Sequence, residues 1–242
     1  ISLISERLCD AADLRAGWRV LDIAGGSGNT ALAAARLGCD VVTLDYVPAL
    51  LDRARERAAA EGLEITVVEG DAAALPFPDA SFDAVISAVG VMFAPDHART
   101  ASEMLRVCRP GGTIAMANWT PDGFIGGLFS PPGAYVPPPA GVPPPPLWGT
   151  EDHVRGLMGD GVRDMRATRR TFTFRERSPE AFVDLFRTYY GPTHMAFGSL
   201  DGEDRDGLYA ALTSLVRRHD VIADETAVAC PADYLEVIAT RL

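Results

Sequence analysis

Three aspartates and one glycine-rich run are the residues whose types and spacing could do chemistry. Asp22 lies two residues before the run from Ala24 to Gly28, while Asp45 and Asp71 stand at or just beyond two further apolar runs. An ionised carboxylate only accepts hydrogen bonds, so such a group favours a ligand that carries hydroxyls and amines. Glycine permits unusual backbone angles and close approach of a ligand to the main chain. These residues predict a small-ligand site.

Each aspartate suits a different part of such a ligand. Asp45 can accept hydrogen bonds from two vicinal hydroxyls, and Asp71 can accept one from an exocyclic amine. The neighbouring Ala72 N–H can donate to a ring nitrogen, and Asp22 can hold an ammonium group directly or through water. Together these groups describe a nucleoside with an amino-acid tail.

The glycine run also fits a dinucleotide-binding pattern. The stretch from Gly26 to Ala31 satisfies GxGxxA, and Asp45 lies near the position expected for a ribose-binding acid. Two features oppose this interpretation: Asp22 interrupts the apolar strand just before the turn, and Asp71 adds a third acid. An NAD(P)-dependent oxidoreductase remains an alternative function.

A repeated strand–helix unit must position these residues. Apolar β-type runs, typical of parallel strands buried on both faces, cover residues 19–24, 41–45, 65–69, 82–87 and 113–117. The alternation predicts an α/β fold with a Rossmann-like, doubly wound, mostly parallel sheet and an antiparallel C-terminal strand. In such a sheet, the carboxyl edge of the strands forms the ligand crevice, where the three aspartates would meet.

The intervening segments carry helix-boundary signals. Asn29 or Thr30 is expected to cap the first helix, which Gly38 stops. Pro48 opens the second helix and Gly62 ends it. Asp96 caps a third helix, which runs to Cys108 and stops at Arg109-Pro110-Gly111-Gly112.

The composition changes in the second half. Residues 131–146 hold nine of the 18 prolines, which predicts a polyproline-like or irregular loop. It serves either as a stiff spacer or as a wall or lid over the site, and binding of a proline-recognition module is a less favoured alternative. Beyond it we expect a helix over 150–158, a more exposed antiparallel strand over 165–176, helices over 178–190 and 208–218, and a last strand over 234–239. Gly191-Pro192 is expected to end the helix that Ser178-Pro179 begins.

Five segments resemble the class I S-adenosylmethionine-dependent methyltransferases, and most closely the small-molecule branch typified by quinone-biosynthesis C-methyltransferases, with a type 11 domain. The matching segments occur in family order and span residues 20–28, 44–51, 69–77, 81–85 and 105–112. The resemblance covers about residues 15 to 120. It implies a cofactor-binding core over 1–120, a Pro-rich loop and helix over 121–160 as a possible substrate lid, and C-terminal elements over 161–242 that complete the sheet and the acceptor site.

The resemblance implies S-adenosyl-L-methionine as the cofactor and a role for each matching residue. The cofactor-binding set is Asp22, Ala24, Gly25, Gly26, Gly28, Asp45, Tyr46, Asp71, Ala72 and Ala88. The glycines would pass beneath the cofactor, Asp45 would hold the ribose, and Tyr46 would pack on the adenine. Asp71 and Ala72 would bind the adenine edge, and the Ala88 backbone would contact the methionine part. Ala24 stands where the family usually has glycine.

Composition narrows the acceptor. All 22 basic residues are arginine, and the 33 acidic residues give a net charge of −11. A chain without lysine has no Schiff-base nucleophile, and this charge disfavours nucleic-acid binding. The segment Ser87-Ala88-Val89-Gly90 lacks the Asp/Asn-Pro-Pro-aromatic motif of amino-directed nucleic-acid methyltransferases. We therefore expect a small organic acceptor, with O-, C- or N-methylation open. A protein that binds S-adenosylmethionine without methyl transfer is a further alternative.

A carbon or hydroxyl acceptor also needs a base. The candidates are His194, His97 and His153, with Tyr189 and Tyr190 as positioners. His194 ranks first because it lies between late elements, where substrate loops sit. Trp119, Phe124 and Trp148 are interpreted either as an apolar acceptor wall or, at least as readily, as ordinary core aromatics.

The remaining expectations concern metals, membranes and location. The four cysteines and four histidines are widely spaced, which favours reduced thiols and gives no metal-site hypothesis. No apolar run reaches the length of a membrane span. We expect a cytoplasmic location for the protein. The chain begins at Ile1 rather than Met, so this expectation leaves targeting open. The sequence sets no oligomeric state.

Overall fold

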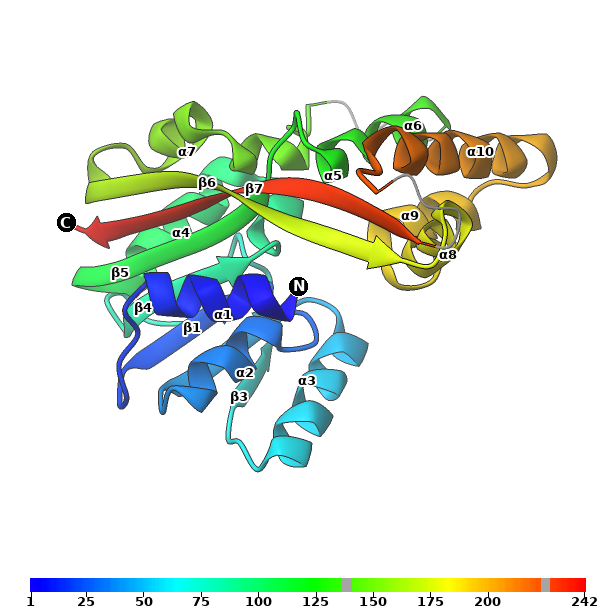
Figure 1. The fold of residues 1–242 in the computed structure, drawn as a ribbon. Helices are drawn as coiled ribbons and strands as arrows, with labels where there is room; N and C mark the ends of the chain where they lie inside the picture. The colour runs from blue at the N-terminus through cyan, green and yellow to red at the C-terminus, as the bar shows by residue number, and fades with distance from the viewer. Residues whose placement is uncertain (136–140, 223–226) are drawn as a thin grey trace. The chain divides into compact units, whose positions relative to one another are not determined.

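The computed structural model describes residues 1–135, 141–222 and 227–242. In this part of the chain the strands are β1 (Arg19–Ile23), β2 (Asp40–Asp45), β3 (Thr66–Glu69), β4 (Phe82–Ala88), β5 (Cys108–Trp119), β6 (Val162–Glu176) and β7 (Val228–Arg241). They form one sheet in the order β3-β2-β1-β4-β5-β7-β6 (Figure 1). The first five strands run parallel, and the C-terminal strand β7 is antiparallel. The predicted fold class is confirmed.

The parallel register brings apolar residues together at the centre of the sheet. Leu21 of β1 pairs with Val42 of β2 on one side and with Val85 of β4 on the other. All three side chains are buried. Burial on both faces explains why these strands read as nearly unbroken apolar runs.

The described helices and helical turns follow the predicted alternation. They are α1 (Ser2–Ala11), α2 (Asn29–Arg36), α3 (Pro48–Glu61), η1 (Val91–Phe93), α4 (His97–Val107), α5 (Phe124–Gly127), α6 (Ser130–Tyr135), η2 (Pro145–Gly149), α7 (Glu151–Met158), η3 (Gly159–Gly161), α8 (Pro179–Tyr189), α9 (Gly191–Gly198) and α10 (Gly202–His219). Pro48 opens α3, and Gly62 ends it with a left-handed φ of +67°. The Asp96 carboxylate accepts from Arg99 N–H and caps α4, as predicted.

Several predicted boundaries are wrong, each for a local reason. Gly28, not Asn29 or Thr30, is the N-cap of α2, and its φ of +84° suits glycine. Strand β5 begins at Cys108 and includes the Arg-Pro-Gly-Gly turn through an irregular register. Gly191-Pro192 follows the end of α8 as predicted, but it also begins the unpredicted helix α9, because proline fits the first helical turn.

The Pro-rich segment is likewise not wholly irregular. Pro131 and Pro132 lie in the first turn of α6, and Pro145 and Pro146 begin the short helix η2. Proline is tolerated there because the first N–H groups of a helix have no partner within it. Residues 136–140 of this segment lie outside the described residues.

The chain divides into two compact units. Unit 1 comprises 1–118, 143–169 and 235–242, and unit 2 comprises 119–142 and 170–234. In unit 1, α1 packs on α2, α2 packs on β1 and β2, and α4 packs on β4 and α7 (Figure 1). Unit 2 has an aromatic core in which Phe174 and Phe182 lie 5.8 Å apart between ring centroids. Unit 1 contains nearly all of the segment expected to bind the cofactor.

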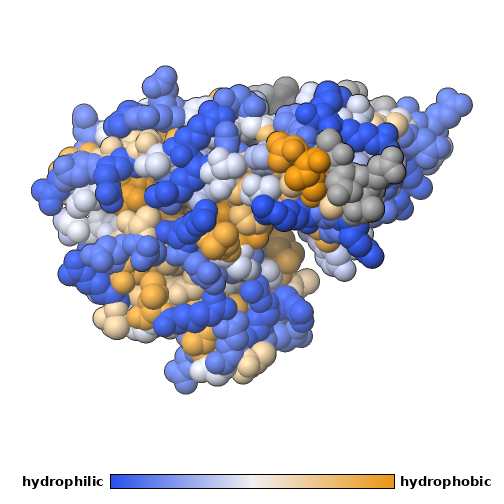
Figure 2. Space-filling view, in the orientation of Figure 1, coloured by the Kyte–Doolittle hydropathy of each residue, from blue (hydrophilic) through white to orange (hydrophobic). Residues whose placement is uncertain are grey.

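Charged and polar side chains cover most of the face drawn in Figure 2, with smaller apolar areas between them. Across the described residues, none of the helices has the length and apolar character needed to cross a membrane. The described residues also contain no cluster of three or more histidine, cysteine or acidic side chains suited to a metal ion.

Candidate cofactor and acceptor site

The glycine-rich loop joins β1 to α2 in a left-handed backbone conformation. The φ angles are +52° at Ala24, +54° at Gly26 and +84° at Gly28. A Cβ at Gly25 would lie 2.1 Å from Thr43 Oγ1, so only glycine lets the loop lie flat on β2. A Cβ at Gly26 would meet nothing closer than 3.9 Å, which leaves that side of the loop open. The loop therefore rests on the sheet with one side free for a ligand.

Asp22 supports this loop from below. Its side chain is completely buried, and its Oδ2 accepts hydrogen bonds from Ala31 N–H at 3.0 Å and from the Thr43 hydroxyl at 3.4 Å. Burial raises the pKa of the Asp22 carboxyl to about 8, and the bond from Ala31 offsets only part of this rise. The buried Oδ1 has no hydrogen-bond partner among the described residues. The predicted contact of Asp22 with an ammonium group stays a prediction.

Asp45 connects the loop to the end of β2. Its Oδ2 accepts from Gly26 N–H and its Oδ1 accepts from Val47 N–H, each at 2.9 Å. A carboxylate oxygen has two lone pairs, so both oxygens keep one for a ligand hydroxyl. The side chain of the next residue, Tyr46, is 71% exposed, which leaves its ring available to a planar group.

Asp71 lies at the same edge, two residues beyond β3. Glu69 pairs with Asp45 in the sheet, and Gly70 N–H donates to Asp45 O at 3.0 Å. The exposed Asp71 carboxylate accepts from Ala73 N–H at 2.8 Å and so caps its own turn, while Ala72 is buried. The three aspartates thus stand at adjacent strand ends, as the sequence predicted, but with very different burial.

Ser87 forms hydrogen bonds that join the end of β4 to the end of β1, just before the glycine loop. The Ser87 hydroxyl donates to Ile23 O at 2.8 Å and accepts from Val91 N–H at 3.0 Å. A Cβ at Gly90 would lie 2.4 Å from Ala24 O, so the two loops are in close contact there. Ser87 is a functional candidate that sequence reasoning missed, because a buried serine in an apolar strand carries no distinctive signal.

Val89 follows Ala88 in an unusual conformation. Its φ is +59°, a sparsely populated region for a β-branched residue, and its N–H donates to Ala117 O at 2.7 Å. Such backbone strain persists only where the surroundings hold it, and it clusters at functional sites. Ala88, the residue expected to contact the methionine part of the cofactor, therefore sits between the Ser87 anchor and a strained residue.

These features fit the cofactor that the resemblance implies. The loop has an open side at Gly26, and Asp22 has a buried oxygen without a partner among the described residues. Each oxygen of Asp45 accepts one backbone hydrogen bond and keeps one lone pair for a ligand. An amino-acid-bearing nucleoside offers hydroxyls and an ammonium group to such acceptors. The roles of the individual residues toward that cofactor stay predictions.

The base candidates divide between the two units. His194 lies exposed on α9 of unit 2, where its Nδ1 contacts Arg187 O at 3.1 Å, and Tyr189 is 80% exposed. His97 and His153 lie in unit 1 and contact each other, Nδ1 to Nε2, at 2.9 Å. The role of His194 as the base stays a prediction.

The three candidate wall aromatics pack as core residues. Trp119 and Phe124 are buried in unit 2, Trp119 against Tyr234 and Phe124 against Phe182. Trp148 is buried in unit 1 against His97, with ring centroids 5.4 Å apart. Their burial favours the core interpretation over an open acceptor wall.

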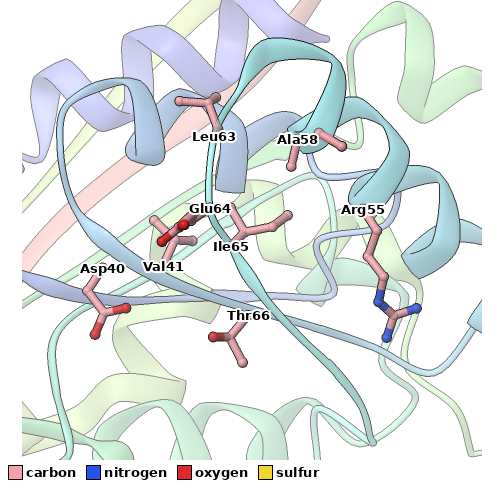
Figure 3. Close-up of a pocket in the computed structure, with 9 residues that line it drawn as sticks. Asp40, Val41, Arg55, Ala58, Leu63, Glu64, Ile65 and Thr66 are labelled. Atoms are coloured by element: carbon pink, nitrogen blue, oxygen red, sulfur yellow. The ribbon is translucent and has the colours of Figure 1, made fainter.

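A separate pocket lies at the opposite end of the strands. It is lined by the amino end of β2, by α3 and by the segment before β3, with Asp40, Arg55 and Glu64 among its side chains (Figure 3). Asp40 begins β2, whereas Asp45 ends it. This pocket is therefore distinct from the carboxyl-edge site.

Comparison with known proteins shows which families this chain is similar to. Residues 21–116 match the family model described as a methyltransferase domain. An uncharacterised protein of Mycobacterium tuberculosis is 47% identical over 216 residues, which cover 88% of this chain and 79% of the relative. A demethylmenaquinone methyltransferase of Thermus thermophilus is 41% identical over 118 residues, 48% of this chain and 54% of that enzyme.

A solved structure shows the same fold. It is a Haemonchus contortus phosphoethanolamine N-methyltransferase in complex with S-adenosylhomocysteine, with a TM-score of 0.63 and 20% identity. The match covers 99% of this chain and 52% of that one. At this identity the likeness concerns the fold.

Proposed function

This chain belongs to the class I S-adenosylmethionine-dependent methyltransferases, and we propose that it methylates a small organic acceptor. The family membership favours methyl transfer over the NAD(P)-dependent alternative. The net charge of −11 and the absence of lysine support a small acceptor over a nucleic acid. The demethylmenaquinone enzyme is matched over 54% of its length, so its acceptor does not carry over to this chain.

One observation carries the cofactor assignment. The Asp45 carboxylate lies where β2 ends beneath the glycine loop, held by the N–H groups of Gly26 and Val47. We propose that its remaining lone pairs bind the ribose hydroxyls, with the exposed Tyr46 ring on the adenine and Asp71 and Ala72 at the adenine edge. Asp22 would face the ammonium end, and the Ala88 backbone would face the methionine chain.

When bound, S-adenosylmethionine supplies a methyl group that is already activated for in-line displacement. The chain's own contribution is then alignment and exclusion of water. The hydrogen bonds of Ser87 and Asp45 fix the loops that would orient the two reactants. For a hydroxyl or carbon acceptor the chain must also remove a proton. The segment 121–160 as a substrate lid is a further part of this proposal.

Isotopic methyl transfer tests the proposed function. Purified protein is incubated with S-adenosylmethionine carrying a deuterated methyl group and a library of phenols, quinols, amines and small acids. We expect a mass shift of one labelled methyl group in at least one acceptor, with S-adenosylhomocysteine formed in equal amount. Binding of the cofactor with no labelled product from the library, or from extract of a producing cell, would support the non-catalytic alternative instead.

A further inference from the structure

A pair of histidines in unit 1 forms a hydrogen-bonded unit outside the cofactor loop. His97 is the first residue of α4 and His153 lies on α7, with His97 Nδ1 2.9 Å from His153 Nε2. The Trp148 ring lies 5.4 Å from His97 and 6.4 Å from His153, measured between centroids. His97 is 3% exposed, whereas His153 is only partly buried. One imidazole is therefore enclosed and the other reaches the surface.

Three buried polar atoms around this pair have no hydrogen-bond partner among the described residues. They are His97 Nε2, Thr100 Oγ1 and Trp148 Nε1. Thr100 lies three residues after His97 and so projects from the same face of α4. Buried polar groups are nearly always paired with protein or ordered water. Three unpaired groups of this kind indicate a polar site that something outside the chain completes.

His97, at the N-terminus of α4, lies at the same carboxyl edge of the sheet as the cofactor loop. Strand β4 ends at Ala88, and the chain then passes through η1 into the N-terminus of α4. The helix that follows a parallel strand begins at the carboxyl edge, where ligands bind in open α/β sheets. Helix η1 also packs against η2, which carries Trp148. His97 thus starts the helix that leaves the Ser87–Gly90 segment of the candidate site.

The surroundings keep both imidazoles uncharged. Burial, followed by the neighbouring His153, lowers the pKa of His97 to about 4, and Asp96 opposes this effect. Burial also lowers the pKa of His153. On the two helices of the pair, Arg99, Glu151, Asp152 and Arg155 are exposed, and the buried Glu103 pairs with Arg106. A neutral His97 can accept the N–H of His153, which fixes the lone pair of His153 on Nδ1.

We propose that His153 is the base that takes the proton from the acceptor, with His97 as the residue that positions it. This inference rests on the proposed methyl transfer and applies to an acceptor with a hydroxyl or an acidic C–H. The X–H proton moves to His153 Nδ1, and its electron pair stays on X and forms the bond to the methyl group. The leaving group is the neutral thioether, and the positive charge ends on the His153 imidazolium. His97 Nδ1 stabilises that charge by accepting from Nε2–H.

Nuclear magnetic resonance of ring-¹⁵N-labelled histidine tests the pair without any acceptor. From pH 4 to 9 in the full chain, we expect His153 to hold its proton on Nε2 and to charge first as the pH falls. His97 should remain neutral until His153 is charged. Two imidazoles that titrate independently near their usual pKa, or a His153 proton on Nδ1, would overturn the assignment.

Kinetics with a phenol and quinol panel test the chemical role. Replacing a general base costs about 10²–10⁴-fold in rate, so H153Q should lower kcat by at least about 100-fold. H153Q should bind S-adenosylhomocysteine as tightly as wild type. H97N should shift the acid limb of the pH–rate profile, which a merely structural residue would not move. H219Q, on α10 of unit 2, is the matched histidine control and should keep the wild-type rate.

One result would overturn the role of His153, and another would contradict the proposed function itself. If H194Q loses the rate and H153Q keeps it, His194 is the base and this inference is wrong. Wild-type protein that fails to bind S-adenosylhomocysteine would instead contradict the proposed function. In that case the tautomers seen by magnetic resonance still decide whether the pair exists.

Discussion

At the level of single residues, the three aspartates of the site differ in burial and in hydrogen bonding. Asp22 is buried beneath the loop, Asp45 is 6% exposed with two backbone donors, and Asp71 is exposed and caps a turn. Burial raises the pKa of the Asp22 carboxyl and so favours its protonated form. The sequence predicted that the three aspartates lie at one edge of the sheet. It did not predict how deeply each is buried, because burial depends on how the loop packs.

Replacing Asp45 should weaken cofactor binding. Asp45→Ala removes charge-assisted hydrogen bonds that are worth about 1.5–3 kcal/mol, so the Kd for S-adenosylhomocysteine should rise about 10–100-fold. Calorimetric titration measures this change. Asp71→Ala, at the exposed turn, is the comparison variant and should cost less. Equal affinities of wild type and Asp45→Ala would remove the ribose role.

Asp22 should make folding stability depend on pH. Its carboxyl has a pKa of about 8 in the folded protein, above its ordinary value near 4, so the folded state binds the extra proton between these values. This stabilisation is complete at pH below about 4 and is lost as the pH rises toward 8, by at most about 1.4 kcal/mol per pH unit. Asp22→Asn resembles the protonated form and should lack this loss.

Urea unfolding of wild type and Asp22→Asn at several pH values measures the effect. The variant should gain in unfolding free energy relative to wild type as the pH rises from 4 to 8. Asp10→Asn, at an exposed position on α1, is the control. A difference between wild type and Asp22→Asn that stays constant with pH would show that Asp22 is ionised throughout.

At the element scale, local signals explain what the sequence predicted well. The boundaries set by Pro48, Gly62 and Asp96 depend on neighbouring residues, and the structure confirms them. The apolar runs locate the strands, but β5 and β7 begin several residues earlier than those runs indicate. Helix α1 was not predicted, because its place depends on long-range contacts such as Ser5 Oγ to Thr30 Oγ1 at 3.0 Å. The same limit applies to the His97–His153 pair, whose members are 56 residues apart.

Removing the Ser87 hydroxyl, which joins the ends of β1 and β4, should lower the free energy of unfolding. Ser87→Ala leaves Ile23 O and Val91 N–H buried without their partner, which should cost about 2 kcal/mol of unfolding free energy. Denaturant unfolding measures this loss. Ser214→Ala, at an exposed position on α10, is the matched control and should change stability by less than about 0.5 kcal/mol. Similar values for the two variants would mean that Ser87 does not join the loops.

At the scale of the whole molecule, the charge balance constrains the acceptor. All 22 basic residues are arginine, and several are engaged in ion pairs within the chain, such as Arg36 with Glu61 and Arg106 with Glu103. Arg106 also donates to Phe77 O and Leu75 O, a multiple contact that a lysine ammonium could not reproduce with the same planar geometry. The guanidinium groups of Arg36 and Arg106 are thus already paired within the chain.

We therefore expect the protein not to bind nucleic acids. With a net charge of −11, it should show no binding to labelled duplex DNA or structured RNA even at low salt, where phosphate contacts are strongest. Fluorescence anisotropy measures this, with a basic DNA-binding protein as the positive control. Salt-sensitive binding in the micromolar range would contradict the small-acceptor proposal.

The carboxyl edge around Asp45 is the proposed binding site of the S-adenosyl nucleoside. The most direct test is calorimetric titration of the wild-type chain with S-adenosylhomocysteine, beside a titration with reduced nicotinamide dinucleotide. We expect one site of micromolar or tighter affinity for S-adenosylhomocysteine and none for the nicotinamide. Binding of the nicotinamide without the S-adenosyl nucleoside would contradict it.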